Sequence, residues 1–240
     1  MRQRKRLALV VTPVLLCAAT VGLVVWAHKG ADVSEIGVLA TGKLALRVRE
    51  HVALCAVSTA LAVAVAVPAG VVATRPRLRR LAPPLLFAAN VGQSVPTIAV
   101  LALAFSVTGI GFRTAVIGLW AYSLLPVLRN TVAGLAGVEP AVVEAARGMG
   151  MSRAQVLRRV EFPLAWPVVV AGIRTAAVVN VGTAALATFV GAGGLGALIT
   201  VGLDNQRDRI LYTGAALTAL LALAVDWAIA AVAELGRSRR

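Results

Sequence analysis

Few residues in this 240-residue chain have types that could carry chemistry. Histidine and cysteine, which often act as nucleophiles or metal ligands, occur only as His28, His51, Cys17 and Cys55. The cysteines lie inside apolar runs, and the histidines stand at the edges of such runs without a partner pattern. The chain also lacks the G-x-x-x-x-G-K-S/T loop that would bind ATP. We therefore expect no catalytic residue, no metal site and no bound cofactor.

Two charged residues interrupt long apolar stretches. Arg174 lies 13 residues after Glu161, and Asp226 lies 11 residues before Arg237. At about 1.5 Å of rise per helical residue, both fall at a similar depth from the same end of a helix bundle. An unpaired charge in apolar surroundings is costly, so we predict an ion pair between them. The alternative is that each side chain reaches polar surroundings separately.

The longest polar stretch inside the chain reads EAARGMGMSRAQVLRRVEFP, residues 144–163. Just before it, Pro140 suits the first turn of a helix, where its missing N–H does no harm. Gly148 and Gly150 can supply a left-handed helix end. The pattern predicts a short helix from Pro140 to Arg147 and then a sharp turn.

A second helix is predicted directly after that turn. Ser152 followed by Gln155 is a capping-box pattern. The helix would run from Arg153 to about Glu161 and stop before Pro163. Two short helices around a glycine turn form a compact knob that suits a groove in another protein; the alternative is an ordinary solvated loop.

Composition places this knob on a membrane protein. The chain is 59% hydrophobic and 14% charged, against about 45–50% and 25% in soluble domains. Uncharged runs of 21, 23 and 32 residues occur at 7–27, 52–74 and 81–112, and about 20 apolar residues span a bilayer. The formal net charge of +14 does not indicate nucleic acid, because the basic residues cluster at the ends of apolar runs.

The expected fold is therefore an all-α bundle of about six membrane helices. The predicted segments are 7–27, 52–74, one within 81–112, a short one at 114–128, 165–190 and 210–233. The first is interpreted as an uncleaved helix, because it is long for a signal peptide and no A-x-A site follows. Residues 30–50 are expected to form an outer connection with a short interfacial helix. The two histidines flank these segments and are expected at the membrane interface rather than as ligands.

The distribution of basic residues predicts the orientation. With the N-terminus inside, 16 of the 24 lysines and arginines fall on the inner side and seven on the outer side, with Arg174 inside a helix. Both termini and the knob are therefore expected in the cytoplasm.

The knob carries a resemblance to a known family. Glu144-Ala145-Ala146, three residues, Gly150, nine residues and then Val160-x-Phe162-Pro163 is similar to the EAA motif of ATP-binding cassette importer permeases, E-A-A-x3-G-x9-I-x-L-P. Val for Ile and Phe for Leu are the departures, and both stay apolar. The resemblance implies that the motif couples the chain to a cytoplasmic ATPase subunit, which binds the ATP. The residues that it assigns to coupling are Glu144, Ala145, Ala146, Gly150, Val160, Phe162 and Pro163.

The resemblance extends over roughly residues 51–234. The phrases NVGQSVPTIAVLALA and FVGAGGLGALI look like those of osmoprotectant permeases for glycine betaine, choline or carnitine; methionine and sulfonate permeases share parts of them and remain the alternative. It implies a type I importer core of five helices at 51–240 with the coupling loop 139–163, and an accessory helix and connection at 1–50. Its implied partners are an ATPase dimer, a second permease chain and an external binding protein. A non-transport assembly protein would not need the motif.

Two further groups of residues could serve transport. Polar or helix-breaking residues at membrane depth usually face a cavity or another helix. Such residues are the candidates for the translocation pathway, with helix–helix hydrogen bonding as the alternative: Asn90, Gln93, Ser94, Pro96, Asn180 and Thr183. Four glycines that allow tight turns are assigned by the resemblance to an outer gate, with a simple loop as the alternative: Gly191, Gly193, Gly194 and Gly196.

Overall fold

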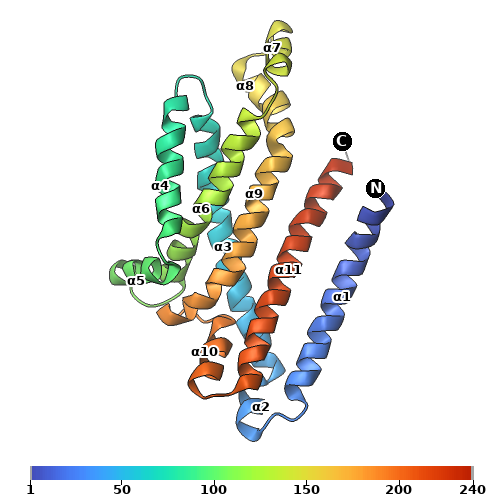
Figure 1. Cartoon of the computed structure of the whole chain (residues 1–240), viewed down its shortest axis with the longest axis vertical. Helices are drawn as coiled ribbons and strands as arrows, with labels where there is room; N and C mark the ends of the chain where they lie inside the picture. Colours follow the sequence, from blue (N-terminus) through green and yellow to red (C-terminus); the bar gives the residue numbers. More distant parts are fainter. Residues whose placement is uncertain (1, 239–240) are drawn as a thin grey trace.

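The computed structural model describes residues 2–238, and every regular element in that range is helical. The long helices run side by side along one axis (Figure 1). The short helices α7 (Pro140–Gly148) and α8 (Arg153–Val156) lie at one end of the bundle, and α2 (Val33–Leu39) and α10 (Gly196–Asp204) lie at the other (Figure 1). We call the first the inner end and the second the outer end, following the charge-based prediction.

Five helical stretches are long and apolar enough to cross a membrane. They are α1 (Arg2–His28), α3 (Thr41–Ala73), α6 (Phe112–Ala136), α9 (Phe162–Thr183) with its flanking turns, and α11 (Asp208–Ser238). The η1 turn (Arg79–Leu81) and α4 (Ala82–Ser94) form one arm of a bent pair, and α5 (Thr97–Thr108) forms the other. If the two arms count as one span, the predicted number of six is reached.

The bent pair replaces the single third segment expected within 81–112. Its arms meet at 96°, and α5 lies across the direction of the long helices (Figure 1). Val95 has an extended ψ of 132°, because a residue that precedes proline is driven out of the helical region. Pro96, which supplies no N–H, then starts the new helix. The predicted interruption is therefore a corner between two helices.

Two helices extend beyond the uncharged runs from which their membrane segments were predicted. The α3 helix begins at Thr41 rather than Val52, because its first turns are charged and project beyond the apolar run. The α6 helix continues past Arg129 to Ala136, where residues 114–128 were expected. Helix hydrogen bonding continues through an exposed charge, so charge marks the membrane edge and not the helix end.

The outer connection contains the expected short helix, α2 (Val33–Leu39). Asp32 caps it by accepting the Glu35 N–H at 2.9 Å, and Glu35 accepts the Asp32 N–H at 3.2 Å. The Ser34 hydroxyl and the Glu35 N–H lower the pKa of the Asp32 carboxyl to about 2. Asp32 also forms an ion pair with Arg207, at the outer end near the start of α11. This pair links the outer connection to the last helix.

The core of the bundle is α3, α6 and α9, which pack through small residues. At Gly172 on α9, an added Cβ would lie 2.5 Å from Asn130 Cβ and 2.7 Å from the Pro126 carbonyl oxygen, both on α6. At Gly70 on α3, it would lie 2.7 Å from a methyl carbon of Thr131. Small residues let helix backbones approach closely in a membrane, where burial supplies little drive for association.

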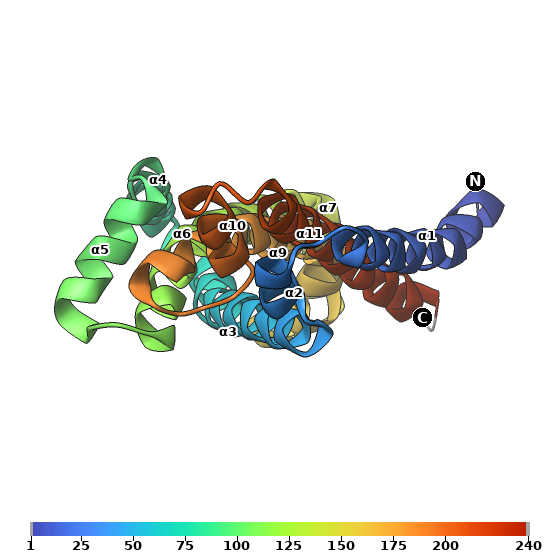
Figure 2. The same ribbon diagram turned by 90° about the horizontal axis from the view of Figure 1, so that it is seen from below.

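The first helix packs against α11, beside this core. The two helices run side by side (Figures 1 and 2). At their outer ends, the Arg209 guanidinium lies 5.0 Å from the Trp26 ring and donates hydrogen bonds to the Trp26 and Lys29 carbonyl oxygens. The first helix contacts α11 and α2, and its accessory role stays a prediction.

Candidate functional site

The knob predicted at residues 139–163 projects from the inner end of the bundle (Figure 1). Its first helix is α7 (Pro140–Gly148), with Pro140 at its start as expected. Gly150 has a φ of +82°, so it supplies the left-handed turn. Gly148 does not, because it is the last residue of the helix and has no positive φ. The turn therefore depends on Gly150 alone.

The second half of the knob starts as predicted and ends differently. Ser152 caps α8 (Arg153–Val156) in a capping box with Gln155. The helix does not stop before Pro163: it widens into a π-helical turn, η2 (Leu157–Glu161), and continues as α9. The wider turn accommodates the missing N–H of Pro163. The knob is thus joined directly to a membrane helix.

The coupling candidates occupy two environments. Glu144, Ala145 and Gly150 are exposed, whereas Ala146 is buried. Val160, Phe162 and Pro163 are partly buried where the knob meets the bundle, and the Phe162 ring lies 5.7 Å from that of Trp166. The structure therefore separates an exposed surface on α7 from an anchoring group at the base of α9.

An ion pair also ties the knob to the end of α3. Arg75 Nη1 lies 2.7 Å from Glu161 Oε2, and the Glu161 side chain is 11% exposed. Arg75 is fixed in turn by hydrogen bonds to the Val71 carbonyl and the Thr74 hydroxyl. Neither residue was singled out from the sequence, where each is one charge among many.

The pathway candidates near the α4–α5 corner have exposed positions. Asn90, Ser94 and Pro96 are exposed, and the Ser94 hydroxyl donates only to the Asn90 carbonyl of its own helix. Gln93 is partly buried and donates to the Tyr122 carbonyl of α6 at 3.2 Å. Three of the four side chains are thus free to face another molecule.

The candidates on α9 lie inside the bundle. Asn180 is fully buried, and its amide donates to the hydroxyls of Ser58 at 3.0 Å and Thr59 at 2.9 Å on α3. The Thr183 hydroxyl donates to the Val179 carbonyl of its own helix. The Asn180 contacts are the helix–helix hydrogen bonds that the sequence left open as the alternative, whereas the Thr183 contact stays within its own helix.

The four glycines form the turn between η3 (Ala184–Val190) and α10 (Gly196–Asp204). Gly191, Gly193 and Gly194 have positive φ values of 70°, 74° and 80°. Gly196 is needed for space instead, because a Cβ there would lie 1.8 Å from the Ala185 carbonyl oxygen. The turn doubles the chain back at the outer end of the bundle (Figure 1).

Glu50 and His51 hold this turn and were missed as functional residues. Glu50 Oε2 accepts the Gly194 N–H at 2.9 Å, and His51 Nδ1 accepts the Leu195 N–H at 3.2 Å. Because Nδ1 is an acceptor, Nε2 carries the proton and donates to the Val181 carbonyl at 2.9 Å. His51 is fully buried inside the protein, and its expected depth at the membrane interface stays a prediction. The only sequence signal was an adjacent acid and histidine beside an apolar run.

The two intramembrane charges are brought together. Arg174 on α9 and Asp226 on α11 form an ion pair with two contacts, through Nε and Nη2 to the two carboxylate oxygens. Their side chains are 44% and 33% exposed. The pair connects α9 of the core to α11, which packs against α1.

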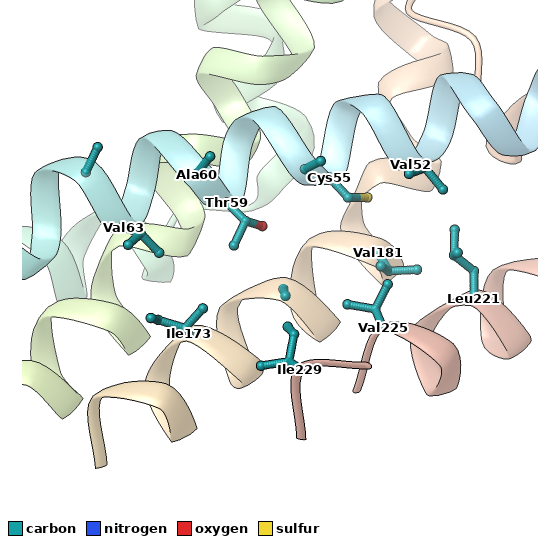
Figure 3. A pocket seen from close by; sticks show the side chains of 13 residues that line it. Val52, Cys55, Thr59, Ala60, Val63, Ile173, Val181, Leu221, Val225 and Ile229 are labelled. Carbon is teal, nitrogen blue, oxygen red and sulfur yellow. The ribbon is translucent and has the colours of Figure 1, made fainter. Parts of the chain in front are cut away.

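An apolar groove of about 530 Å3 lies between α3, α9 and α11, and its lining includes Ile173 and Val225, the sequence neighbours of this pair. Thr59 presents a hydroxyl among valine, alanine, leucine and isoleucine side chains (Figure 3). Among the described residues, neither an aromatic ring nor a charged group lines it. The groove therefore lacks the aromatic surface that usually holds a quaternary ammonium ion.

These features together define a class of protein: a multi-pass helical membrane protein with a short helical knob at one end of its central helices. Residues 66–235 match the family described as binding-protein-dependent transport system inner membrane component. The chain belongs to this family, and it is accordingly a permease component located in the inner membrane. The residues that carry the EAA pattern fall inside the matched range.

Curated relatives agree over most of their length. The chain is 40% identical over 193 residues to the choline transport system permease protein OpuBB of Bacillus subtilis, covering 80% of this chain and 88% of that one. It is 43% identical over 182 residues to the osmoprotectant import permease protein OsmY of Salmonella typhimurium, covering 76% and 77%.

A solved structure has the same fold. The chain superposes on an inward-facing structure of the MetNI methionine ABC transporter with a TM-score of 0.70 and 25% identity, covering 80% of this chain and 95% of that one. The expected all-α importer permease fold is thus confirmed.

Proposed function

We propose that this chain is the permease subunit of an importer that carries an osmoprotectant, such as glycine betaine, choline or carnitine, into the cell. The observation that carries the substrate class is 37–43% identity, over 73–80% of this chain, to permeases named for choline, carnitine or osmoprotectant transport. The groove without an aromatic surface supports a permease that leaves substrate selection to a separate binding protein.

The knob couples ATP hydrolysis in the partner subunit to transport through this chain. A separate ATPase dimer binds ATP and contacts α7, where Glu144 and Ala145 are exposed beside the exposed side chains of Val142 and Met149. Because η2 continues directly into α9, a movement of the knob is transmitted to a membrane helix that also carries the Gly191–Gly196 turn at its far end. This continuity is the physical route from ATP to the gate. The chain itself is then neither an enzyme nor the holder of a cofactor.

A second permease chain, identical or related, covers the α4–α5 corner. On and after α5, Leu103, Val107 and Ile110 are 68%, 84% and 74% exposed, and such a surface marks an interaction site or a lipid contact. Asn90, Ser94 and Pro96 lie at the same corner, so pairing two chains there would place polar groups along a shared pathway. The Gly191–Gly196 turn, near Ile110, would face the external binding protein as the outer gate.

A methionine-type permease is the second candidate, and the superposition on MetNI favours it. The identity to that chain is 25%, below the 37–43% shared with the osmoprotectant relatives. We therefore rank methionine as the alternative substrate.

Uptake measurements test the proposal. Cells that lack this chain, the same cells complemented with it, and cells complemented with Gly150→Asp would be given labelled glycine betaine, choline or methionine at high salt. Restored uptake of an osmoprotectant by the native chain alone supports both the substrate and the role of the knob. Restored uptake of methionine alone, or equal uptake in all three strains with the chain present in the membrane, refutes the osmoprotectant assignment.

A further inference from the structure

A basic cavity lies between the knob and the end of α3. It encloses about 380 Å3 and is lined by residues 75–78 on one side and by residues of α7, α8 and η2 on the other. Four of its lining residues are arginines, and its one acidic residue is Glu161. The arginines are Arg75, Arg77, Arg147 and Arg153.

The charges around this cavity are not balanced. Glu161 pairs with Arg75, whereas Arg77, Arg147 and Arg153 have no acidic partner among residues 2–238. Three guanidinium groups in excess around one cavity repel one another. A bound anion would remove that repulsion and could accept paired hydrogen bonds from the planar guanidinium groups.

The depth of the cavity in the membrane identifies the anion. Trp166 is 39% exposed on α9, and tryptophan is enriched where the hydrocarbon core meets the headgroups. Glu161 lies five residues nearer the inner end, which is about 7–8 Å along a helix. The headgroup layer is about 5–7 Å thick on each side of the hydrocarbon core. With Trp166 at the inner face of this layer, the cavity beside Glu161 lies at the outer edge of the headgroup layer, within reach of lipid phosphate groups.

One exposed apolar side chain fits the same ligand. Leu78 lines the cavity and is 41% exposed, so it offers apolar contact beside the arginines. The exposed apolar residues Val142, on α7, and Met149, directly after it, do not line the cavity. The surface proposed for the ATPase and this cavity thus use different side chains.

We propose that this cavity binds the phosphate group of a membrane phospholipid, and that the bound lipid joins the knob to the α3–α4 connection. A phospholipid with net negative charge binds more tightly than a zwitterionic one, because the excess of positive charge favours it. The site is independent of the solute that the protein carries.

Lipid binding to the purified full-length chain tests this. Native mass spectrometry would titrate phosphatidylglycerol, phosphatidylcholine and inorganic phosphate against the native chain and three double variants. Arg77→Gln with Arg153→Gln removes two cavity arginines. Arg79→Gln with Arg80→Gln removes the same charge from the exposed η1 turn, outside the cavity, and is the matched control. Arg77→Lys with Arg153→Lys keeps the charge and checks that the site still folds.

We expect the native chain to retain phosphatidylglycerol in preference to phosphatidylcholine. The cavity variant should lose about tenfold in affinity for phosphatidylglycerol, at about 1 kcal/mol or less per arginine, whereas the control and the lysine variant should lose much less. Equal losses in the cavity and control variants, no preference between the lipids, or saturation by inorganic phosphate at the same concentration would overturn the proposal. Displacement of the lipid by the ATPase subunit would assign the arginines to that partner and overturn it as well.

Discussion

Arg174 and Asp226 lie 52 residues apart in the sequence and join α9 to α11 through two contacts between one guanidinium and one carboxylate. Among the five ion pairs of the described residues, this one joins two different candidate membrane spans. A charge left alone at such depth costs about 2.5–3.5 kcal/mol. The pair therefore makes each residue depend on the other.

Removing one partner should destabilise the protein more than removing both. We expect Asp226→Leu or Arg174→Leu alone to cost about 2–3 kcal/mol, because each leaves one charge unpaired at membrane depth. Arg174→Leu with Asp226→Leu should recover most of this loss. Thermal unfolding of the purified variants in detergent, arranged as a double-mutant cycle, measures the coupling. Additive effects of the two single changes would show that the pair contributes nothing.

The contacts of His51 and Glu50 predict unequal effects at neighbouring positions. His51→Ala leaves the Leu195 N–H and the Val181 carbonyl without partners, so we expect a loss of about 2–4 kcal/mol. Glu50→Gln keeps a side-chain oxygen for the Gly194 N–H and should cost under about 1 kcal/mol. Unfolding temperatures give the comparison, and a Glu50→Gln loss as large as that of His51→Ala would contradict it.

The turn in the knob tests the coupling role at one position. Gly150→Val places a β-branched side chain at a φ of +82°, which costs about 1–3 kcal/mol of local strain. An added Cβ has no atom within 4 Å at either Gly150 or Gly148, so Gly148→Val is the matched control. Solute uptake should fall severalfold or more in the first and little in the second, at equal amounts in the membrane. Similar uptake in both variants would show that coupling does not require the left-handed turn at Gly150.

Much of this architecture was predictable because its signals are local. The capping box at Ser152, the left-handed Gly150 and the approximate positions of the apolar spans each depend on a few neighbouring residues. The same holds for the break at Pro96, although its 96° angle does not follow from the sequence. Packing of α5 against α6 and η3 sets that angle.

The remaining features depend on partners that are distant in sequence. His51 binds atoms 130 and 144 residues away, and one histidine at the end of an apolar run gives no sign of this. The helix through Pro163 was missed for another reason: a π-helical turn tolerates the proline, and propensity rules assume a regular α-helix. Asn180 had the right polarity for either a pathway or a helix contact, and its hydrogen bonds to Ser58 and Thr59 depend on the position of α3, 122 and 121 residues away.

Space, rather than backbone conformation, decides the effect of substituting Gly196. A Cβ there would lie 1.8 Å from the Ala185 carbonyl oxygen, so Gly196→Ala should displace α10 or η3 and lower stability by about 3 kcal/mol or more. Gly182 has no atom within 4 Å of an added Cβ, so Gly182→Ala should be neutral or slightly stabilising in its helix. Fluorescence-detected size exclusion with heating measures both. Equal melting of the two variants would contradict the tight contact.

Variants of Asn180 test whether this side chain acts by holding two helices together or by contacting the transported solute. Asn180→Ala removes two hydrogen bonds to α3, and membrane hydrogen bonds average about 0.6–2 kcal/mol each. Thr183→Val, which removes only an intrahelical bond, should change stability by less than about 0.5 kcal/mol. If Asn180 acts by holding α3 to α9, uptake per folded chain should follow the loss of stability and be restored at lower temperature. If uptake stays low where the variant is fully folded, Asn180 contacts the solute in another conformation of the transporter, and the helix contact is only one of its two roles.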